Sequence, residues 1–282
     1  MTTDTKEIYS EIYNKLAEND SLFPAFPQTA MRIRDLINED DCSISDVATL
    51  LKADPALTAL IMRAATSVRF LSVFPPKNID AAIGRIGLST TSELVTAFAL
   101  RSVFVSSSSE LKILLQDIYQ RSTKIAILAY FLAEKTSRLS PAKAMLAGLL
   151  QDISLPPILM SLSKRPEIFN DLKLRAEAID HLAPEVGALI LKKWKFNKEM
   201  IEAVRSRKQW MRDGHKKPDL GDIILIARIH STIGTLEVKD HPNLPDIPAF
   251  GKFDLGELTP DQSLEILDDA KDEIAELNRL LA

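Results

Sequence analysis

The chain has 282 residues, 46% hydrophobic and 26% charged, which is the balance of a globular protein with enough apolar material for a core. Its formal net charge of −4 argues against a general nucleic-acid binder, because such proteins need a basic surface. The single cysteine, Cys42, excludes an internal disulfide and cysteine-rich metal sites. We find no secretory signal and no run of about 18 uncharged apolar residues. We therefore expect a cytoplasmic protein without a membrane span.

Helix signals recur along the whole chain. Ile8, Ile12 and Leu16 stand four residues apart and predict an amphipathic N-terminal helix. Asp54 and Ser140 each precede a proline, which is the pattern of a capping side chain followed by proline in the first helical turn. Alternating patterns typical of strands are missing, so the sequence predicts an all-α fold. The predicted helices cover residues 28–39, 44–52, 55–66, 78–86, 89–104, 111–136, 141–152, 166–178, 183–194, 197–207, 219–234 and 260–280.

Two segments suggest boundaries. Ser106 to Ser109 form a polar run between two helical stretches, and His241 to Phe250 contain three prolines that predict a loop or extended arm. We therefore divide the chain into an N-terminal helix (1–20), a central domain (21–235, with lobes 21–107 and 108–235) and an arm with a C-terminal helix (236–282). Apolar residues three and four apart in the last helix resemble a short coiled-coil seam. Packing of that helix on its own chain is favoured over a homodimer.

Several sequence runs resemble the HDOD family, the HD-related output domains of bacterial signalling proteins. The resemblance covers about residues 20 to 230, and its motifs occur in the family's order. They are Leu22 to Pro27, Asp54 to Ser67, Ile79 to Leu88, Leu146 to Ile153 and Glu185 to Trp194. The resemblance implies a multi-helix, HD-like bundle preceded by an N-terminal helical lobe.

An HD phosphohydrolase binds divalent metal through His and Asp side chains, and the resemblance indicates which residues occupy those positions here. They are Arg121, Gln151, Asp152, Ala183, Arg207 and Arg228. Only Asp152 can ligate as a carboxylate, because a guanidinium stays protonated and has no acceptor atom. His181, His215, His230 and His241 form no spaced metal-binding pair. The resemblance therefore implies a vestigial site with no catalytic residue, metal or cofactor.

The arginines at this site allow more than one interpretation. Arg121 is in register with Ile118 and Ile125, so it should point partly inward, and a buried arginine needs a carboxylate. We predict that Arg121 or Arg228 pairs with Asp152. The alternative is that both arginines extend to solvent. A third interpretation is that Arg121, Arg207 and Arg228 hold a small anionic ligand.

A basic stretch, Lys192 to Lys217, is bracketed by Trp194 and Trp210. It could meet an acidic partner, an anionic ligand or nucleic acid, but a solvated helix face is the favoured interpretation. The resemblance as a whole implies a non-catalytic signal-transduction output protein that acts through protein partners. The alternatives are a divergent metal-dependent phosphohydrolase acting on a nucleotide or phosphodiester, and a sensor of a small anion in the vestigial site.

Overall fold

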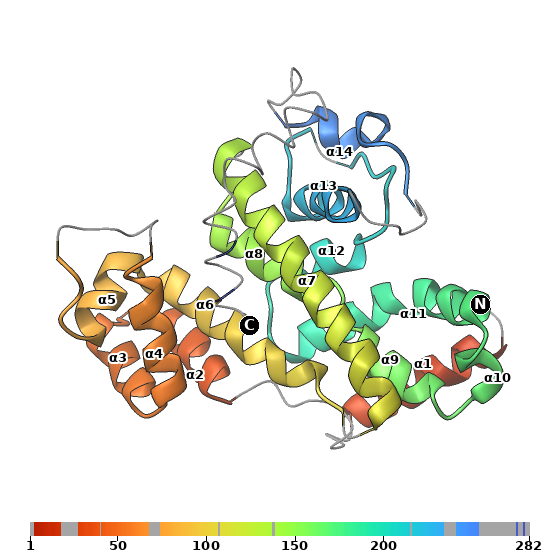
Figure 1. The fold of residues 1–282 in the computed structure, drawn as a ribbon, viewed down its shortest axis with the longest axis horizontal. Coiled ribbons are helices and arrows are strands. Elements are labelled where there is room, and N and C mark those ends of the chain that lie inside the picture. Colours follow the sequence, from red (N-terminus) through yellow and green to blue (C-terminus); the bar gives the residue numbers. More distant parts are fainter. Residues whose placement is uncertain are drawn as a thin grey trace. The chain divides into compact units, whose positions relative to one another are not determined.

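The computed structural model describes residues 3–17, 28–39, 41–67, 74–106, 108–136, 139–214, 216–233 and 241–253, with Ala275 and Arg279. These residues form helices and connecting loops, and no strand occurs among them (Figure 1). The predicted all-α fold class is therefore confirmed. The chain divides into two compact units. One contains the described residues of 1–25 and 103–260, and the other contains those of 26–102 and 261–282.

The smaller unit is a bundle of five helices among the described residues. They are α2 (Gln28–Ile37), α3 (Ile44–Lys52), α4 (Pro55–Ala64), α5 (Ile79–Ile86) and α6 (Leu88–Leu100). Local capping sets their starts: Ser43 and Asp46 form a reciprocal capping box, and the Asp54 and Asn78 side chains accept backbone N–H groups. Gly87 joins α5 to α6 at φ 87°, a conformation that favours glycine.

The longest described helix of the larger unit is α7 (Ser109–Thr136), which packs against α8 (Pro141–Leu150) and α13 (Leu220–Thr232) (Figure 1). The other elements of this unit are α1 (Thr3–Ala17), α8 (Pro141–Leu150), α9 (Leu155–Leu162), α10 (Pro166–Phe169), α11 (Leu172–Lys193), α12 (Lys198–Arg205), α13 (Leu220–Thr232), η3 (Leu244–Asp246) and α14 (Pro248–Gly251). The 3-10 turn η2 (Arg101–Phe104) contains the point at which the two units divide. Gly148 allows α8 to approach α7 closely, because a Cβ there would lie 2.5 Å from the Cα of Ala126.

Two helix predictions in the larger unit were wrong. The predicted helices 166–178 and 183–194 are instead the short α10 and the continuous α11, in which Pro184 lies inside the helix. The Asp171 side chain caps the start of α11, and the helix continues through Pro184 although the proline removes one backbone hydrogen bond and crowds the carbonyl of Asp180, four residues earlier. Helix α9 was missed, because Pro156 and Pro157 occupy its first turn, where proline is tolerated.

The segment predicted as a loop or extended arm, residues 241–250, contains η3 and α14 and packs on α13. Leu244, Ile247 and Ala249 are buried, which explains why this proline-rich segment does not extend into solvent. Helix α1 was set apart as its own segment, whereas it packs on α9 and α11 within the larger unit. The predicted lobe boundary at 107/108 also differs from the division of the units after Ser102.

Some predictions fall outside the described residues. They are the run Leu22 to Pro27, the C-terminal helix 260–280 with its seam (apart from Ala275 and Arg279), and His215. One described segment, Pro141–Leu162, is long and apolar enough by length and composition to cross a membrane, but 94% of its apolar window is buried by the chain itself. That segment comprises α8, the turn with Asp152, and α9, and its burial accounts for its apolar character.

Candidate functional site

The candidate site is built around the turn between α8 and α9. Gln151 ends α8, and Asp152 follows it with an exposed fraction of 0%. The backbone carbonyl of Asp152 accepts a hydrogen bond from the Leu155 amide at 3.0 Å. This bond links the turn to the first residue of α9, so the Asp152 carboxylate is held in the interior by local backbone geometry.

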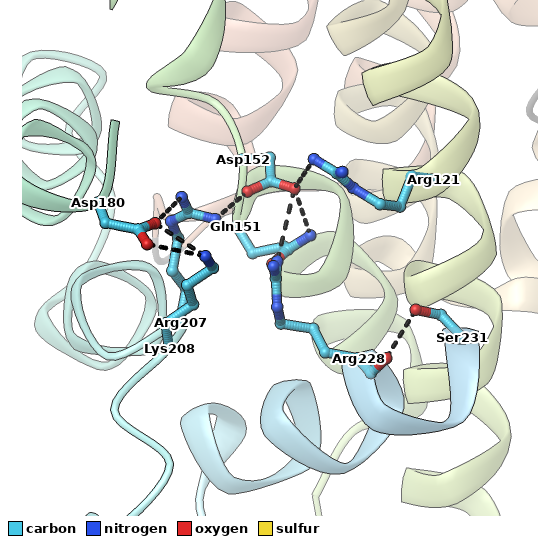
Figure 2. A network of polar contacts seen from close by, with 8 residues as sticks. All are labelled: Arg121, Gln151, Asp152, Asp180, Arg207, Lys208, Arg228 and Ser231. Carbon is cyan, nitrogen blue, oxygen red and sulfur yellow. Dashed lines mark hydrogen bonds and ion pairs between the residues drawn. The ribbon is translucent and has the colours of Figure 1, made fainter. Parts of the chain in front are cut away.

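Three arginines from different parts of the larger unit converge on this carboxylate (Figure 2). Arg121 on α7 places Nη2 3.3 Å from Oδ2, and Arg228 on α13 places Nη1 3.5 Å from the same oxygen. Arg207, just beyond α12, donates from Nη1 to Oδ1. The Gln151 amide donates to Oδ2 at 3.0 Å and accepts from Arg228 Nη1. Both predicted ion pairs, of Arg121 and of Arg228 with Asp152, are therefore present, and Arg207 adds a third.

The helices that carry these arginines are fixed to each other. The Lys124 ammonium on α7 donates to the Ser231 carbonyl on α13 at 2.6 Å, and the Ser231 hydroxyl donates to the Arg228 carbonyl at 2.7 Å. Arg207 also lies 3.9 Å from Asp180 on α11, which binds Lys208 at 2.8 Å (Figure 2). The site therefore joins α7, α11, the end of α12 and α13 around one buried turn.

The electrostatics of the site follow from this excess of cations. Burial by itself would raise the pKa of Asp152, but Arg207, Arg228 and Arg121 together hold it well below its ordinary value. Burial lowers the pKa of Arg228 to about 10; Asp152 opposes that shift, and Arg207 and Arg121 add to it. The carboxylate is therefore ionised at neutral pH, and the arginines repel one another while sharing it.

The residues at this site do not fit a divalent metal. Both Asp152 oxygens already accept from cationic or amide donors, and the surrounding guanidinium groups offer no acceptor atom. Ala183, which the resemblance places at a ligand position, is fully buried on α11 and contributes only a methyl group. Across the described ranges, no group of three or more His, Cys, Asp or Glu side chains could hold a metal ion.

A cavity of about 320 Å³ adjoins the arginine cluster. Arg121, Arg207 and Arg228 border it, together with residues that the sequence did not single out for this site. These are Leu114, Ile118, Ile125, Leu155, Leu159, Leu172, Arg175, Ala176, Ile179, Asp180, Lys208, Trp210, Ser231, Thr232 and His241. Lys208 and Trp210 belong to the basic stretch, in which Arg205 pairs with Glu185 and Glu202, and Arg212 pairs with Asp219 and Asp222. Arg207 and Arg212 are turned inward into ion pairs. The lysines of the stretch are exposed, as the solvated face predicts, at Lys192, Lys193, Lys195, Lys198, Lys216 and Lys217.

The described histidines occupy three different environments. His181 is exposed, with Nδ1 2.9 Å from the Glu177 carbonyl of its own helix. His230 is 3% exposed, and burial lowers its pKa to about 4. His241 borders the cavity, where its Nε2 lies 2.8 Å from the Thr232 hydroxyl and its ring lies 5.8 Å from that of Trp210.

Comparison with known proteins decides the family. The HDOD domain model matches residues 23–210. The chain belongs to the HDOD family. Arg121, Asp152 and Arg207 lie within the HDOD match, whereas Arg228 on α13 follows it.

Solved structures share this HDOD fold. A Shewanella amazonensis SB2B protein named "Putative metal-dependent phosphohydrolase" aligns with a TM-score of 0.75 and 22% identity over 100% of both chains. An HDOD domain protein with unknown function from Geobacter sulfurreducens aligns at 0.67 and 21% identity, over 98% of this chain and 97% of that one. At these identities the likeness establishes the fold alone. A curated relative, an uncharacterized protein of Treponema pallidum, is 23% identical over 216 residues, which are 72% of this chain and 40% of that protein. The chain therefore spans less than half the length of that relative.

Proposed function

We propose that this HDOD protein is a non-catalytic output module that acts through protein partners in cytoplasmic bacterial signal transduction. The observation that carries the proposal is the contact of three arginines with the buried Asp152 carboxylate. The HD resemblance places metal ligands at these positions, and the charge of the site is unsuited to that role.

The physical argument concerns charge. A divalent cation brought to Asp152 would have to displace guanidinium groups from both carboxylate oxygens and would then lie beside them in a poorly screened interior. The same ion pairs weaken Asp152 as a proton acceptor, because they hold its pKa far below neutrality. Asp180, a carboxylate that borders the cavity, is held by Lys208. Neither group is suited to activating a water molecule.

A role in signalling is supported by the family and by the name of one protein of the same fold. A Marinobacter aquaeolei protein called "Putative signal transduction protein" aligns with a TM-score of 0.62 and 18% identity, over 98% of this chain and 65% of that one. A module with no reaction of its own must pass its signal to another molecule by contact, so protein partners are part of the proposal.

Two measurements test this function. Purified protein dialysed against Mn²⁺ is analysed for bound metal, and it is then assayed for phosphate release from phenyl phosphate and from bis-(4-nitrophenyl) phosphate. We expect substoichiometric metal and no Mn²⁺-dependent turnover. Stoichiometric metal together with turnover would establish the divergent phosphohydrolase instead.

Affinity capture of the tagged chain from its native host should recover a protein that binds again when both partners are purified. The lack of any such protein would count against the partner-mediated role.

A further inference from the structure

The cavity beside the arginine cluster carries an unusual concentration of positive charge. Five cationic side chains border it, namely Arg121, Arg175, Arg207, Lys208 and Arg228. Among the described residues that line it, Asp180 is the only carboxylate, and Asp152 lies behind three of the arginines. The described residues in the cavity wall and directly behind it thus include two carboxylates against five cationic side chains. Such an excess in a recessed, poorly screened place attracts anions.

Two of these arginines have donor capacity left over. A guanidinium carries five N–H donors, and within the described part of the chain Arg121 uses only Nη2, on Asp152. The Nε atoms of Arg121 and Arg228 are buried and have no hydrogen-bond partner among the described residues. Arg121 is also the most open of the three, with 39% of its side chain exposed. Its guanidinium can therefore bind Asp152 on one side and a ligand on the other.

Much of the rest of the cavity wall is apolar or aromatic. Ile118, Ile125, Leu155 and Leu159 come from α7 and α9, and the Trp210 ring lies beside that of His241 at 5.8 Å between centroids. A bare inorganic ion would leave this wall unused. A ligand with an anionic head and an aromatic body would meet both kinds of surface, and about 320 Å³ is at the small end of ligand sites.

We propose that this cavity binds a small phosphate monoester with an aromatic body, the phosphate lying on Arg121, Arg207 and Arg228 and the ring lying toward Trp210. A phosphate monoester is close to dianionic at neutral pH and presents three acceptor oxygens, which match forked arginine donors. The inference rests on the proposed non-catalytic function, because the ligand is held without being consumed. The site would then be the sensing element of the module.

Isothermal titration calorimetry of the metal-free full chain at low ionic strength tests the site. Phenyl phosphate is the probe, phenol is its uncharged counterpart, and inorganic phosphate is the head group alone. We expect phenyl phosphate to bind, inorganic phosphate to bind at least about tenfold more weakly, phenol to give no measurable binding, and added salt to weaken the interaction.

Matched variants locate the binding. Arg121→Gln should weaken phenyl phosphate binding about tenfold or more, because one forked donor pair is lost. Arg63→Gln removes an exposed arginine from α4, in the other unit, and should leave binding unchanged. Trp210→Ala should weaken phenyl phosphate while leaving inorganic phosphate as it was. Thermal melting of each variant verifies folding, and Lys208→Gln, on the half-buried rim, replaces Arg121→Gln if that variant does not fold.

The outcomes separate this inference from the proposed function. No binding of phenyl phosphate at millimolar concentration by the folded wild type would overturn the ligand site, and the non-catalytic role would stand. Equal binding by wild type and by the Arg121 and Lys208 variants would overturn it as well, because the ligand would then lie elsewhere. Release of phosphate from phenyl phosphate once Mn²⁺ is added would instead contradict the proposed function.

Discussion

Replacing Asp152 by asparagine tests the central electrostatic feature of the fold. The substitution keeps the shape of the side chain and removes the negative charge that Arg121, Arg207 and Arg228 share. Asp152 is 0% exposed, and the side chains of Arg207 and Arg228 are 4% and 11% exposed, so solvent cannot replace the lost charge for those two. Arg121 is more than a third exposed and adds little, because water screens it.

The expected loss of stability is large. Removing one partner of a buried ion pair costs about 3–5 kcal/mol, and for a unit of this size each kcal/mol lowers Tm by about 2–4 °C. We therefore expect Asp152→Asn to lower Tm by about 6–20 °C at pH 7. Urea unfolding followed by far-ultraviolet circular dichroism gives the free energy directly.

The pH dependence carries the sign of the effect. The folded-state pKa of Asp152 lies below its ordinary value, so its contribution to stability is complete above about pH 3.9, the unfolded-state value, and is lost as the pH falls further. The gap between wild type and Asp152→Asn should thus be full at pH 7 and narrow below about pH 4. Asp180→Asn is the control, because that 44% exposed carboxylate pairs with Lys208 and its loss should cost less than Asp152→Asn. A variant Asp152→Asn within about 1 kcal/mol of wild type would refute the reasoning.

Three further predictions concern other contacts of the larger unit. Glu11→Gln should lower the free energy of unfolding by about 1 kcal/mol at pH 7. Burial raises the pKa of Glu11, but Lys15 and groups at the end of α9 lower it to about 2. In urea titrations the difference from wild type should therefore vanish as the pH falls from about 4.5 toward 2. Gly148→Ala should cost about 1–3 kcal/mol in the same unfolding assay, because its Cβ would clash with the Ala126 backbone. Wild type should lose stability as the pH falls from 6.5 to 4, because the unfolded chain binds a proton at His230 in that range and the folded protein does so only near pH 4. His230→Gln should reduce that loss.

Each of these has a clear contrary result. A Glu11→Gln cost that persists unchanged at pH 2 would show that shape, not charge, holds α1 on α9. An unchanged melting temperature in Gly148→Ala would mean that α7 and α8 separate without cost. Identical pH profiles of wild type and His230→Gln would exclude His230 as a source of acid sensitivity.

Helix starts were predictable because capping is local. Ser43 with Asp46, Asp54 before Pro55, and Ser140 before Pro141 are legible within four residues, and each caps the helix that the sequence placed there. Arg121 was also predictable as inward-pointing, because its register with Ile118 and Ile125 is a property of one helix. Arg121 does point partly inward: its side chain is 39% exposed, and its Nη2 lies 3.3 Å from the buried Asp152 carboxylate.

The remaining features depend on contacts between distant segments. Pro184 marks a helix start in most local patterns, whereas α11 continues through it and packs against α1, α9 and α12. The cavity was invisible for the same reason. Trp210 and His241 are 31 residues apart in the numbering, and their rings meet only through the folding of α13 and the segment after it.

The convergence of three arginines on one carboxylate leaves the site with an excess of positive charge. Asp152 offsets part of the cost of burying them, yet one negative charge cannot neutralise three positive ones. Burial is the main cause of the lowered pKa of Arg228, and repulsion by Arg207 and Arg121 adds to it. A dianionic ligand would relieve that repulsion at the side of the cluster that Asp152 does not reach. The same ligand would bind folded protein only, so it should raise Tm in proportion to the logarithm of its concentration above Kd. Stability and sensing would then share one source, the excess positive charge beside the turn between α8 and α9.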